Sequence, residues 1–99
     1  MVDIFAVLAD RTRRHLLDTM RHGEAPVGRL AAEVGLAQPA VSQHLRVLRA
    51  AGLVDVRIDA QRRYYRVRPE ALAEAARWLE PYRALWADRL DAPSAAESR

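Results

Sequence analysis

Apolar residues in the first half of the chain recur at intervals of three and four, the spacing of amphipathic helices. The pattern predicts four helices, over residues 2–9, 11–22, 26–34 and 38–51. Asp10 is a favourable N-cap for the second helix, and Gly23, Gly35 and Gly52 lie just past the ends of the later three. The side chains on the predicted buried faces of these later helices are Arg13, Leu16, Leu17, Met20, Val27, Leu30, Ala31, Val34, Val41, Leu45 and Leu48.

The next segment changes to the two-residue alternation of β-strands. In "LVDVRID", residues 53–59, apolar and charged side chains alternate, and "RRYYRVR", residues 62–68, is rich in aromatic and β-branched residues. A turn at Ala60 and Gln61 would join the two strands as a hairpin, but it lacks the Asn-Gly or Asp-Gly pair of a tight turn. The register of the hairpin is therefore left open.

Pro69 begins a long C-terminal helix with apolar residues at helical spacing. Pro81 lies inside this helix and, because proline has no N–H, should kink it or split it after Glu80. Residues 92–99, "APSAAESR", have too little apolar content to pack and are expected to form a frayed tail. Residues 1–91 are predicted to form one domain.

The predicted order is four helices, a hairpin and a fifth helix, a mainly α fold with a small β-hairpin (α+β). Only residues 35–37 separate the third and fourth helices, as in a helix-turn-helix. Ala31 is small enough for these helices to approach, Gly35 tolerates a positive φ, and Val41 fills the angle between them. A hairpin that directly follows a helix-turn-helix forms a wing, so the predicted fold class is a winged helix-turn-helix.

Three of the predicted helices begin without a good capping side chain. Ala25, Ala37 and Arg68 occupy positions where Ser, Thr, Asn or Asp is usual. A proline follows each of them within two residues and fixes φ in the first turn, which partly substitutes for a cap.

Charge is distributed unevenly along the chain, and every basic residue is an arginine. Residues 1–68 hold 12 Arg against 7 acidic residues, whereas residues 69–99 hold 4 Arg against 6. The exclusive use of arginine is equally consistent with a GC-rich genome, but that explanation does not account for the asymmetry. A basic N-terminal two-thirds suits a polyanionic partner.

The remaining composition bears on the compartment. No run of about 18 apolar residues is present, and "MVDIFAVLADRTRR" lacks the basic region of a signal peptide. The absence of cysteine excludes disulfides and thiol chemistry. The expected location is the cytoplasm, without membrane contact.

The fourth predicted helix directs polar side chains away from its buried stripe. With Leu45 at the centre of the stripe, Pro39, Gln43 and Arg46 point outward and Ser42 lies on a flank. The second helix of a helix-turn-helix meets base edges in the major groove, where Gln can bond adenine and Arg can bond guanine. We therefore predict double-stranded DNA as the partner.

The predicted wing carries four arginines that could hold phosphates, although each could equally be a solvated charge. His44 is expected to form a hydrogen bond within the domain or to a phosphate. The complete set of predicted DNA-contacting residues is Gln38, Pro39, Ser42, Gln43, His44, Arg46, Arg57, Gln61, Arg62 and Arg63.

The segments "LADRTRRHLLDTM", "PAVSQHLRVLRAAGLV" and "RRYYRVRPEAL" together resemble the ArsR/SmtB family of winged-helix repressors, especially its metal-free, SdpR-like autorepressor branch. The resemblance covers residues 3–91. It implies a homodimer joined through the first and last helices that binds an imperfect inverted repeat, the operator, at a promoter. The DNA-contacting positions that it implies are Gln38, Ser42, Gln43, Arg46, Arg62 and Arg63.

The chain departs from this family at the metal-binding positions. Metal-responding members carry Cys-x-Cys in the third helix, where this sequence reads "VGRLAAEV", and others place Asp and His ligands along the last helix. The histidines here, His15, His22 and His44, fall on different predicted helices and have no i, i+4 partner. We expect no metal and no other cofactor.

The apolar surface of the C-terminal helix is wider than one domain face needs. Leu72, Leu79 and Trp86 follow one another at intervals of seven, and Trp78 and Leu85 form a second stripe. A two-fold dimer would cover this surface and place two reading helices about 34 Å apart. The alternative is that Trp86 folds back on its own domain. The predicted interface residues are Val2, Phe5, Leu8, Leu72, Leu79, Tyr82, Trp86 and Leu90.

Two other functions stay open at this point. The domain could be a protein-interaction module, although such a surface would be expected to carry exposed aromatic residues. A pocket near Trp78, Tyr82 and Trp86 in a dimer could bind a small molecule, although such aromatics are more often core. Catalysis is not expected, because Ser42 and His44 diverge by about 200° around a helix.

Overall fold

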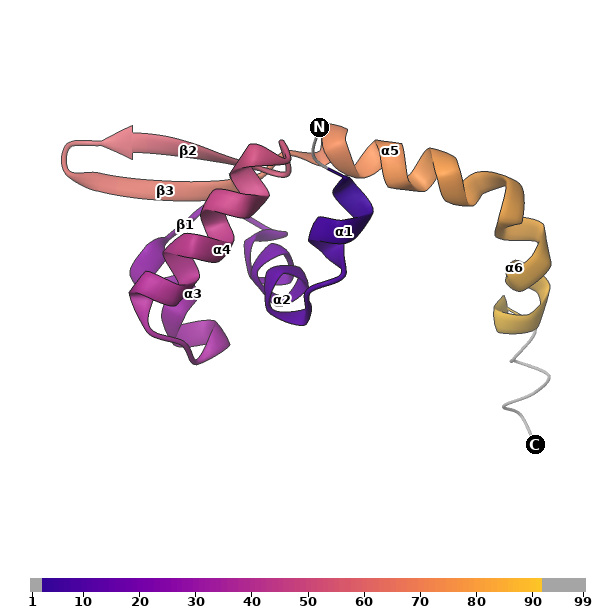
Figure 1. Ribbon diagram of the computed structural model, residues 1–99, viewed down its shortest axis with the longest axis horizontal. Coiled ribbons are helices and arrows are strands. Elements are labelled where there is room, and N and C mark those ends of the chain that lie inside the picture. The colour runs from indigo at the N-terminus through magenta and orange to yellow at the C-terminus, as the bar shows by residue number, and fades with distance from the viewer. Residues whose placement is uncertain (1–2, 92–99) are drawn as a thin grey trace.

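The computed structural model describes residues 3–91 and has the predicted order of elements, with one additional short strand (Figure 1). The predicted winged helix-turn-helix is confirmed. Val2 and the predicted tail over 92–99 lie outside the described residues. The elements are α1 (Ile4–Leu8), α2 (Arg11–Met20), β1 (Ala25–Pro26), α3 (Val27–Val34), α4 (Gln38–Ala50), β2 (Val54–Asp59), β3 (Arg62–Val67), α5 (Pro69–Leu79), the 3₁₀ turn η1 (Glu80–Tyr82) and α6 (Arg83–Asp91).

The core lies where α2, α3 and α4 pack together and is closed by the start of the sheet. The predicted buried stripes are confirmed for the apolar residues of these helices, with the ends of the α3 stripe only half-buried, whereas Arg13, also predicted on the buried face, is only partly buried. α1 packs on the core through Ile4 and Val7, whereas Phe5 stays exposed and Leu8 is half-buried. The most completely buried side chains are Leu16, Met20, Leu30, Val41, Leu45, Leu48, Leu53 and Val54.

The helix starts follow local capping chemistry, with one correction. The Asp10 carboxylate accepts a hydrogen bond from the Arg13 backbone N–H (3.0 Å), so its predicted N-cap role is confirmed. Ala37 and Arg68 cap α4 and α5 without a side-chain bond, as predicted. Ala25 is not the N-cap of the third helix. It is held extended in β1, so α3 begins only after Pro26.

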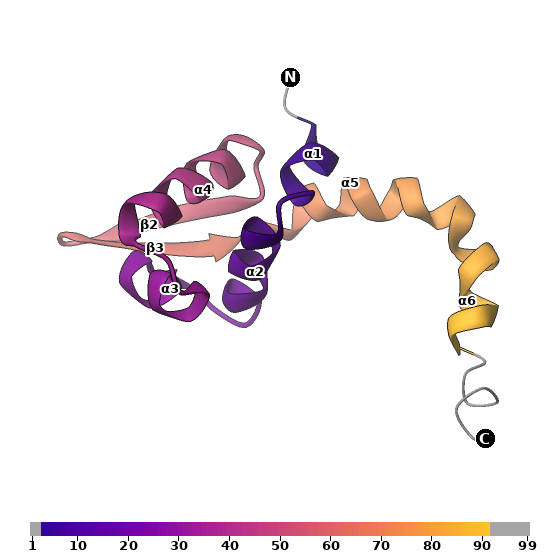
Figure 2. The same cartoon turned by 60° about the horizontal axis from the view of Figure 1, so that its bottom comes forward.

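The sheet has three antiparallel strands in the order β1-β3-β2, so the prediction of a two-stranded hairpin was incomplete. β1 pairs Ala25 with Tyr65, and β2 pairs with β3 along the whole hairpin, from Val54 opposite Val67 to the turn. The turn is the two residues Ala60 and Gln61, with Ala60 at φ +58°. This hairpin, residues 54–67, is called the wing below, and its tip projects beyond the helices (Figure 2).

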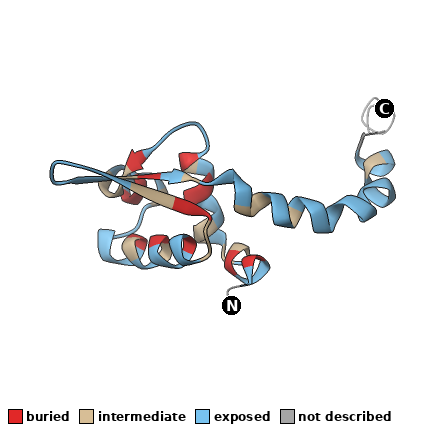
Figure 3. Ribbon diagram, turned by 90° about the horizontal axis from the view of Figure 1, so that it is seen from above, coloured by how far each residue is buried: buried red, intermediate tan, exposed pale blue. Residues whose placement is uncertain are grey.

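The C-terminal elements form an arm, residues 69–91, that leads away from the rest of the molecule (Figures 1 and 2). The α-helix ends at Leu79 and Pro81 lies in a 3₁₀ turn, which confirms the predicted break and bends the apolar stripe. The first turns of α5 pack on the core through Ala71 and Leu72. Figure 3 shows almost no buried residue farther along the arm. Among the described helices, none is long and apolar enough to cross a membrane.

Candidate nucleic-acid interface

Helix α4 presents a polar face from a firmly packed base. Val41, Leu45 and Leu48 are buried completely, which fixes the rotation of the helix about its axis. Gly35 has φ +73° and ends α3 in the left-handed conformation, so the chain turns directly into α4. Of the predicted contacts on α4, Gln38, Pro39, Gln43 and Arg46 are exposed, and Ser42 and His44 are half-buried.

A groove of about 380 Å³ runs between α4 and the wing. Arg46 and Arg49 of α4 and Arg63 of β3 line it, together with Ser42. None of the three guanidinium groups has an ion pair within the described residues. Converging cations without a carboxylate attract an external anion, and the guanidinium fork matches a phosphate group.

Arg49 was not among the predicted contacts. It lies seven residues after Ser42 and three after Arg46, which places the three on one side of α4. This spacing was available in the sequence and could have identified Arg49. Arg63 could not be assigned to the same groove, because the register of the hairpin was open.

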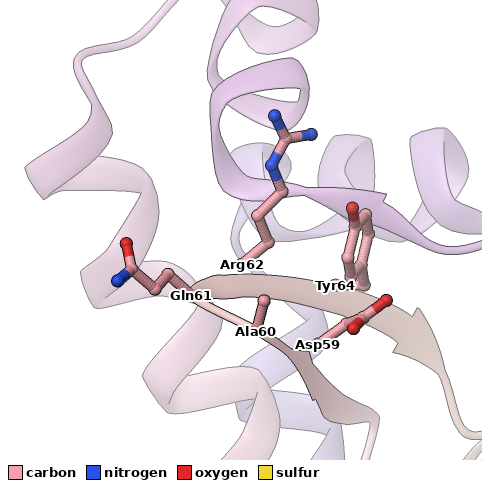
Figure 4. A pocket seen from close by; sticks show the side chains of 5 residues that line it. All are labelled: Asp59, Ala60, Gln61, Arg62 and Tyr64. Carbon is pink, nitrogen blue, oxygen red and sulfur yellow. The ribbon is translucent and has the colours of Figure 1, made fainter.

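The two arginines at the tip of the wing face in different directions. Because side chains alternate along a strand, Arg63 turns toward α4 and Arg62 turns to the opposite face. Arg62, Gln61 and Tyr64 line a hollow of about 450 Å³ at the turn (Figure 4). In Figure 4, Arg62 and Tyr64 extend to the same side of the hairpin and Gln61 extends beyond its end. All three predicted tip residues, Gln61, Arg62 and Arg63, are exposed.

Arg57 differs from the arginines of the groove because acidic groups surround it. Its Nε donates to Glu24 Oε2 (3.1 Å), its Nη2 donates to Glu24 Oε1, and its Nη1 lies 3.6 Å from Asp59 Oδ2. The hydrogen bonds from Arg57 hold the pKa of Glu24 below its usual range, and Glu24 in turn raises the pKa of Arg57. Arg66 also has an acidic partner, Asp55 (3.6 Å), so part of the basic surplus is neutralised within the chain.

His44 faces Arg13 of α2. Its Nδ1 lies 3.5 Å from Arg13 Nη1, while Arg13 Nε donates to the carbonyl oxygen of Val7 (2.8 Å). The Arg13 backbone N–H holds the pKa of Asp10 below its usual range. His44 therefore lies within hydrogen-bond distance of its own domain, one of its two predicted roles. No three of His, Cys, Asp and Glu lie together as a metal site anywhere in the described part of the chain.

The predicted interface residues lie mainly along the arm and are largely exposed. Leu79, Tyr82, Trp86 and Leu90 have exposed fractions of 40–61%, whereas Leu72 is half-buried. Phe5 of α1 contacts Trp78 edge-on, with ring centroids 5.7 Å apart, and Trp78 lies against Tyr82. The small-molecule pocket expected in a dimer near these aromatic residues stays a prediction. The hollow beside Trp86 is only about 190 Å³ and does not include Trp78 or Tyr82.

The chain is similar to known bacterial regulators of transcription. The family model for bacterial regulatory proteins of the arsR family matches residues 10–56. The chain is 47% identical over 66 residues to the HTH-type transcriptional regulator Rv2034 of Mycobacterium tuberculosis, covering 67% of this chain and 62% of that protein. It is 28% identical over 79 residues to the transcriptional repressor SdpR of Bacillus subtilis, covering 80% and 88%. The crystal structure of a possible transcriptional regulator for arsenical resistance is 41% identical, with a TM-score of 0.76 and 97% of each chain covered.

A helix-turn-helix with an adjacent wing, and arginines converging between them, defines a winged-helix regulator of transcription. The chain belongs to the ArsR family of bacterial regulatory proteins, as its resemblance implied. Its similarity to SdpR agrees with the predicted branch of the family. Because this family and these relatives regulate transcription, the prediction that the chain is not an enzyme is confirmed.

Proposed function

We propose that this protein is a homodimeric repressor that binds an inverted-repeat operator through α4 and the wing. The observation that carries the proposal is the groove in which Arg46, Arg49 and Arg63 converge beside Ser42. A phosphate of the DNA backbone would supply the anion that this groove lacks. The protein would act in the cytoplasm, where bacterial DNA lies.

The exposed face of α4 divides into a reading part and a gripping part. Gln38, Pro39 and Gln43 lie toward the N-terminal end of α4, the end that meets base edges in a helix-turn-helix. Arg46 can bond guanine from the same face, whereas Arg49 and Arg63 are placed to hold phosphates. Gln61 and Arg62 extend the contact from the tip of the wing to an adjacent part of the backbone.

The exposed apolar surface of the arm supports the presence of a second copy of the chain. Trp78, Leu85 and Leu90 each expose more than half of their surface, and together with Trp86 they extend along α5 and α6. Within the described residues, Phe5 of the body contacts Trp78, while the ribbon of α6 runs well away from the body (Figures 1 and 2). A two-fold pairing of arms, with Phe5 of α1 beside them, would cover it with identical apolar residues. The same axis would set two α4 helices one turn of DNA apart.

Selection from random duplex DNA tests the function and defines the operator in the same experiment. The selected sites should converge on an imperfect inverted repeat, and the DNA upstream of the protein's own gene should compete for binding. Affinity should fall steeply between low and physiological salt, because arginine–phosphate contacts release counterions. Arg77→Ala removes one exposed positive charge from the arm, outside α4 and the wing. It therefore serves as the control for arginine variants of α4 and the wing, which lose a charge in the same way. Failure to enrich any site, or an affinity that is flat with salt, would refute DNA binding.

A further inference from the structure

Arg57 reaches across the central strand of the sheet. It projects from β2, whereas its partner Glu24 immediately precedes β1, and β3 lies between these two strands. The guanidinium group passes over the ring of Tyr64, 4.7 Å from the ring centroid. Tyr64 is the residue paired with Arg57 on β3, so both side chains share one face of the sheet. The pair Glu24–Arg57, called the strap below, therefore joins the two outer strands.

The wing has few other attachments on this side. β1 consists of two residues, and one of them is Pro26, which cannot donate a ladder hydrogen bond. The apolar contacts of the wing extend from its base as far as the paired residues Val56 and Tyr65 and end before Ile58, which is 63% exposed. A two-stranded hairpin is only marginally stable on its own, so a further contact near the middle of the wing helps to fix its angle.

Acidic groups balance the charge of the Arg57 guanidinium, although its side chain stays half exposed. Two of its nitrogens bond to Glu24, the third faces Asp59, and one ring face of Tyr64 lies beneath the group. A phosphate that approached this guanidinium would be repelled by the two nearby carboxylates. Arg62 and Arg63, by contrast, have no ion pair among the described residues.

We propose that Glu24 and Arg57 are positioning residues: the strap sets the angle between the wing and α4, so that Arg62 and Arg63 meet the DNA backbone. Arg57, predicted from the sequence as a DNA contact, then acts through the wing and makes no phosphate contact of its own. This inference rests on the proposed DNA binding. An exposed ion pair adds little to global stability, so the effect of the strap is on geometry and not on folding.

Glu24→Gln gives the sharpest test, because a purely electrostatic effect and a positioning effect predict opposite changes in DNA affinity. Removing a negative charge from a DNA-binding domain should tighten binding by Coulomb attraction alone. A lost strap should instead weaken operator binding, by roughly threefold at fixed salt, the order expected when an exposed ion pair is lost. Glu33→Gln, an exposed change on α3 outside any described ion pair, is the matched control and should bind as well as the natural protein or slightly better.

Arg57→Gln separates positioning from a phosphate contact. Affinity should fall, but the slope of log affinity against log salt should stay unchanged, whereas Arg62→Gln should reduce that slope by about one. The charge swap Glu24→Arg with Arg57→Glu should recover most of the affinity that either single change loses. Tighter binding by Glu24→Gln, or a reduced slope in Arg57→Gln, would overturn the proposal.

Hydrogen exchange on the free protein tests the strap without DNA. Amides of the wing should exchange faster in Glu24→Gln than in Glu33→Gln, while amides of α2 and α4 exchange equally in both. Equal exchange in the wing would refute the strap itself. If wing exchange differs but the natural protein binds no DNA, the proposed function has failed and the strap has not.

Discussion

The body, residues 3–67, and the arm, residues 69–91, differ in how far their apolar side chains are buried. The body buries leucine, valine and methionine from three helices in a continuous core. The arm leaves Trp78, Leu79, Tyr82, Leu85, Trp86 and Leu90 exposed by 40–72%. One chain therefore covers the apolar side chains of the body and leaves those of the arm exposed, and the proposed dimer would cover them.

The largest expected effect is on the core of the body. Leu45→Ala removes a completely buried side chain of α4 and should lower the free energy of unfolding by about 2–5 kcal/mol. Leu85→Ala, on the arm, removes a side chain that is 72% exposed and should change that free energy of a single chain much less. Urea unfolding at low protein concentration measures both. Equal losses would mean that the arm packs within its own chain.

The second prediction breaks the arm and leaves the body intact. Leu79→Glu combined with Trp86→Glu places charges on the exposed apolar face and should give monomers with a folded body. Operator affinity should fall by roughly 100-fold or more, because the second half-site is no longer bound by a linked domain. Light scattering and titration of the operator measure the two effects. A double variant that stayed dimeric would place the interface elsewhere.

A third prediction separates the two DNA-binding parts of the body. Arg46→Ala should cost about 1–3 kcal/mol at its own base position and relax sequence preference there. Arg49→Ala should weaken all sequences nearly uniformly and reduce the salt slope by about one. Titrations with the selected operator and a scrambled duplex compare the variants. Identical behaviour of the two would remove the distinction between reading and gripping residues.

The elements that the sequence predicted well are those built from neighbouring residues. Stripes such as Val41, Leu45 and Leu48 depend only on helical period, and the break at Pro81 depends on one missing N–H. β1 was missed because its signal is not local. Two residues, Ala25 and Pro26, become a strand only by pairing with residues about forty positions later.

The candidate site likewise has a part that local sequence predicts and a part that depends on non-local pairing. The outward face of α4 could be predicted because rotation about a helix follows from spacing. The separation of the wing arginines could not, since it required the register that places Arg57 opposite Tyr64. The partnership of Arg57 with Glu24 joins residues that are 33 positions apart, and nothing in either local segment indicates it.

A smaller effect concerns the tip of the wing. Ala60 has φ +58°, a conformation that costs an L-residue about 1–2 kcal/mol and glycine much less. After the extra chain entropy of glycine is subtracted, Ala60→Gly should stabilise the protein by roughly 0.5 kcal/mol. Thermal unfolding measures the change. A lower melting temperature would mean that the turn does not hold Ala60 in this conformation.

A further small effect is a pH dependence within the body. The hydrogen bond from the Arg13 backbone N–H lowers the pKa of Asp10 in the folded state. The ionised cap therefore stabilises the fold fully at pH values above the pKa of an unfolded aspartate. This stabilisation is lost as the pH falls through the folded-state pKa. Asp10→Ala should therefore lower the melting temperature at pH 7, and the gap to the natural protein should close in acid. A gap that is independent of pH would mean that the carboxylate charge has no part in the cap.

The contrast between body and arm is tested most directly by the mass of the protein alone and on its operator. Sedimentation equilibrium should give twice the mass of one chain for the free protein and two chains per inverted repeat in the complex. Both values follow if the exposed face of the arm is an interface between two copies. A protein that sediments as a monomer and still binds the full repeat tightly would contradict the account.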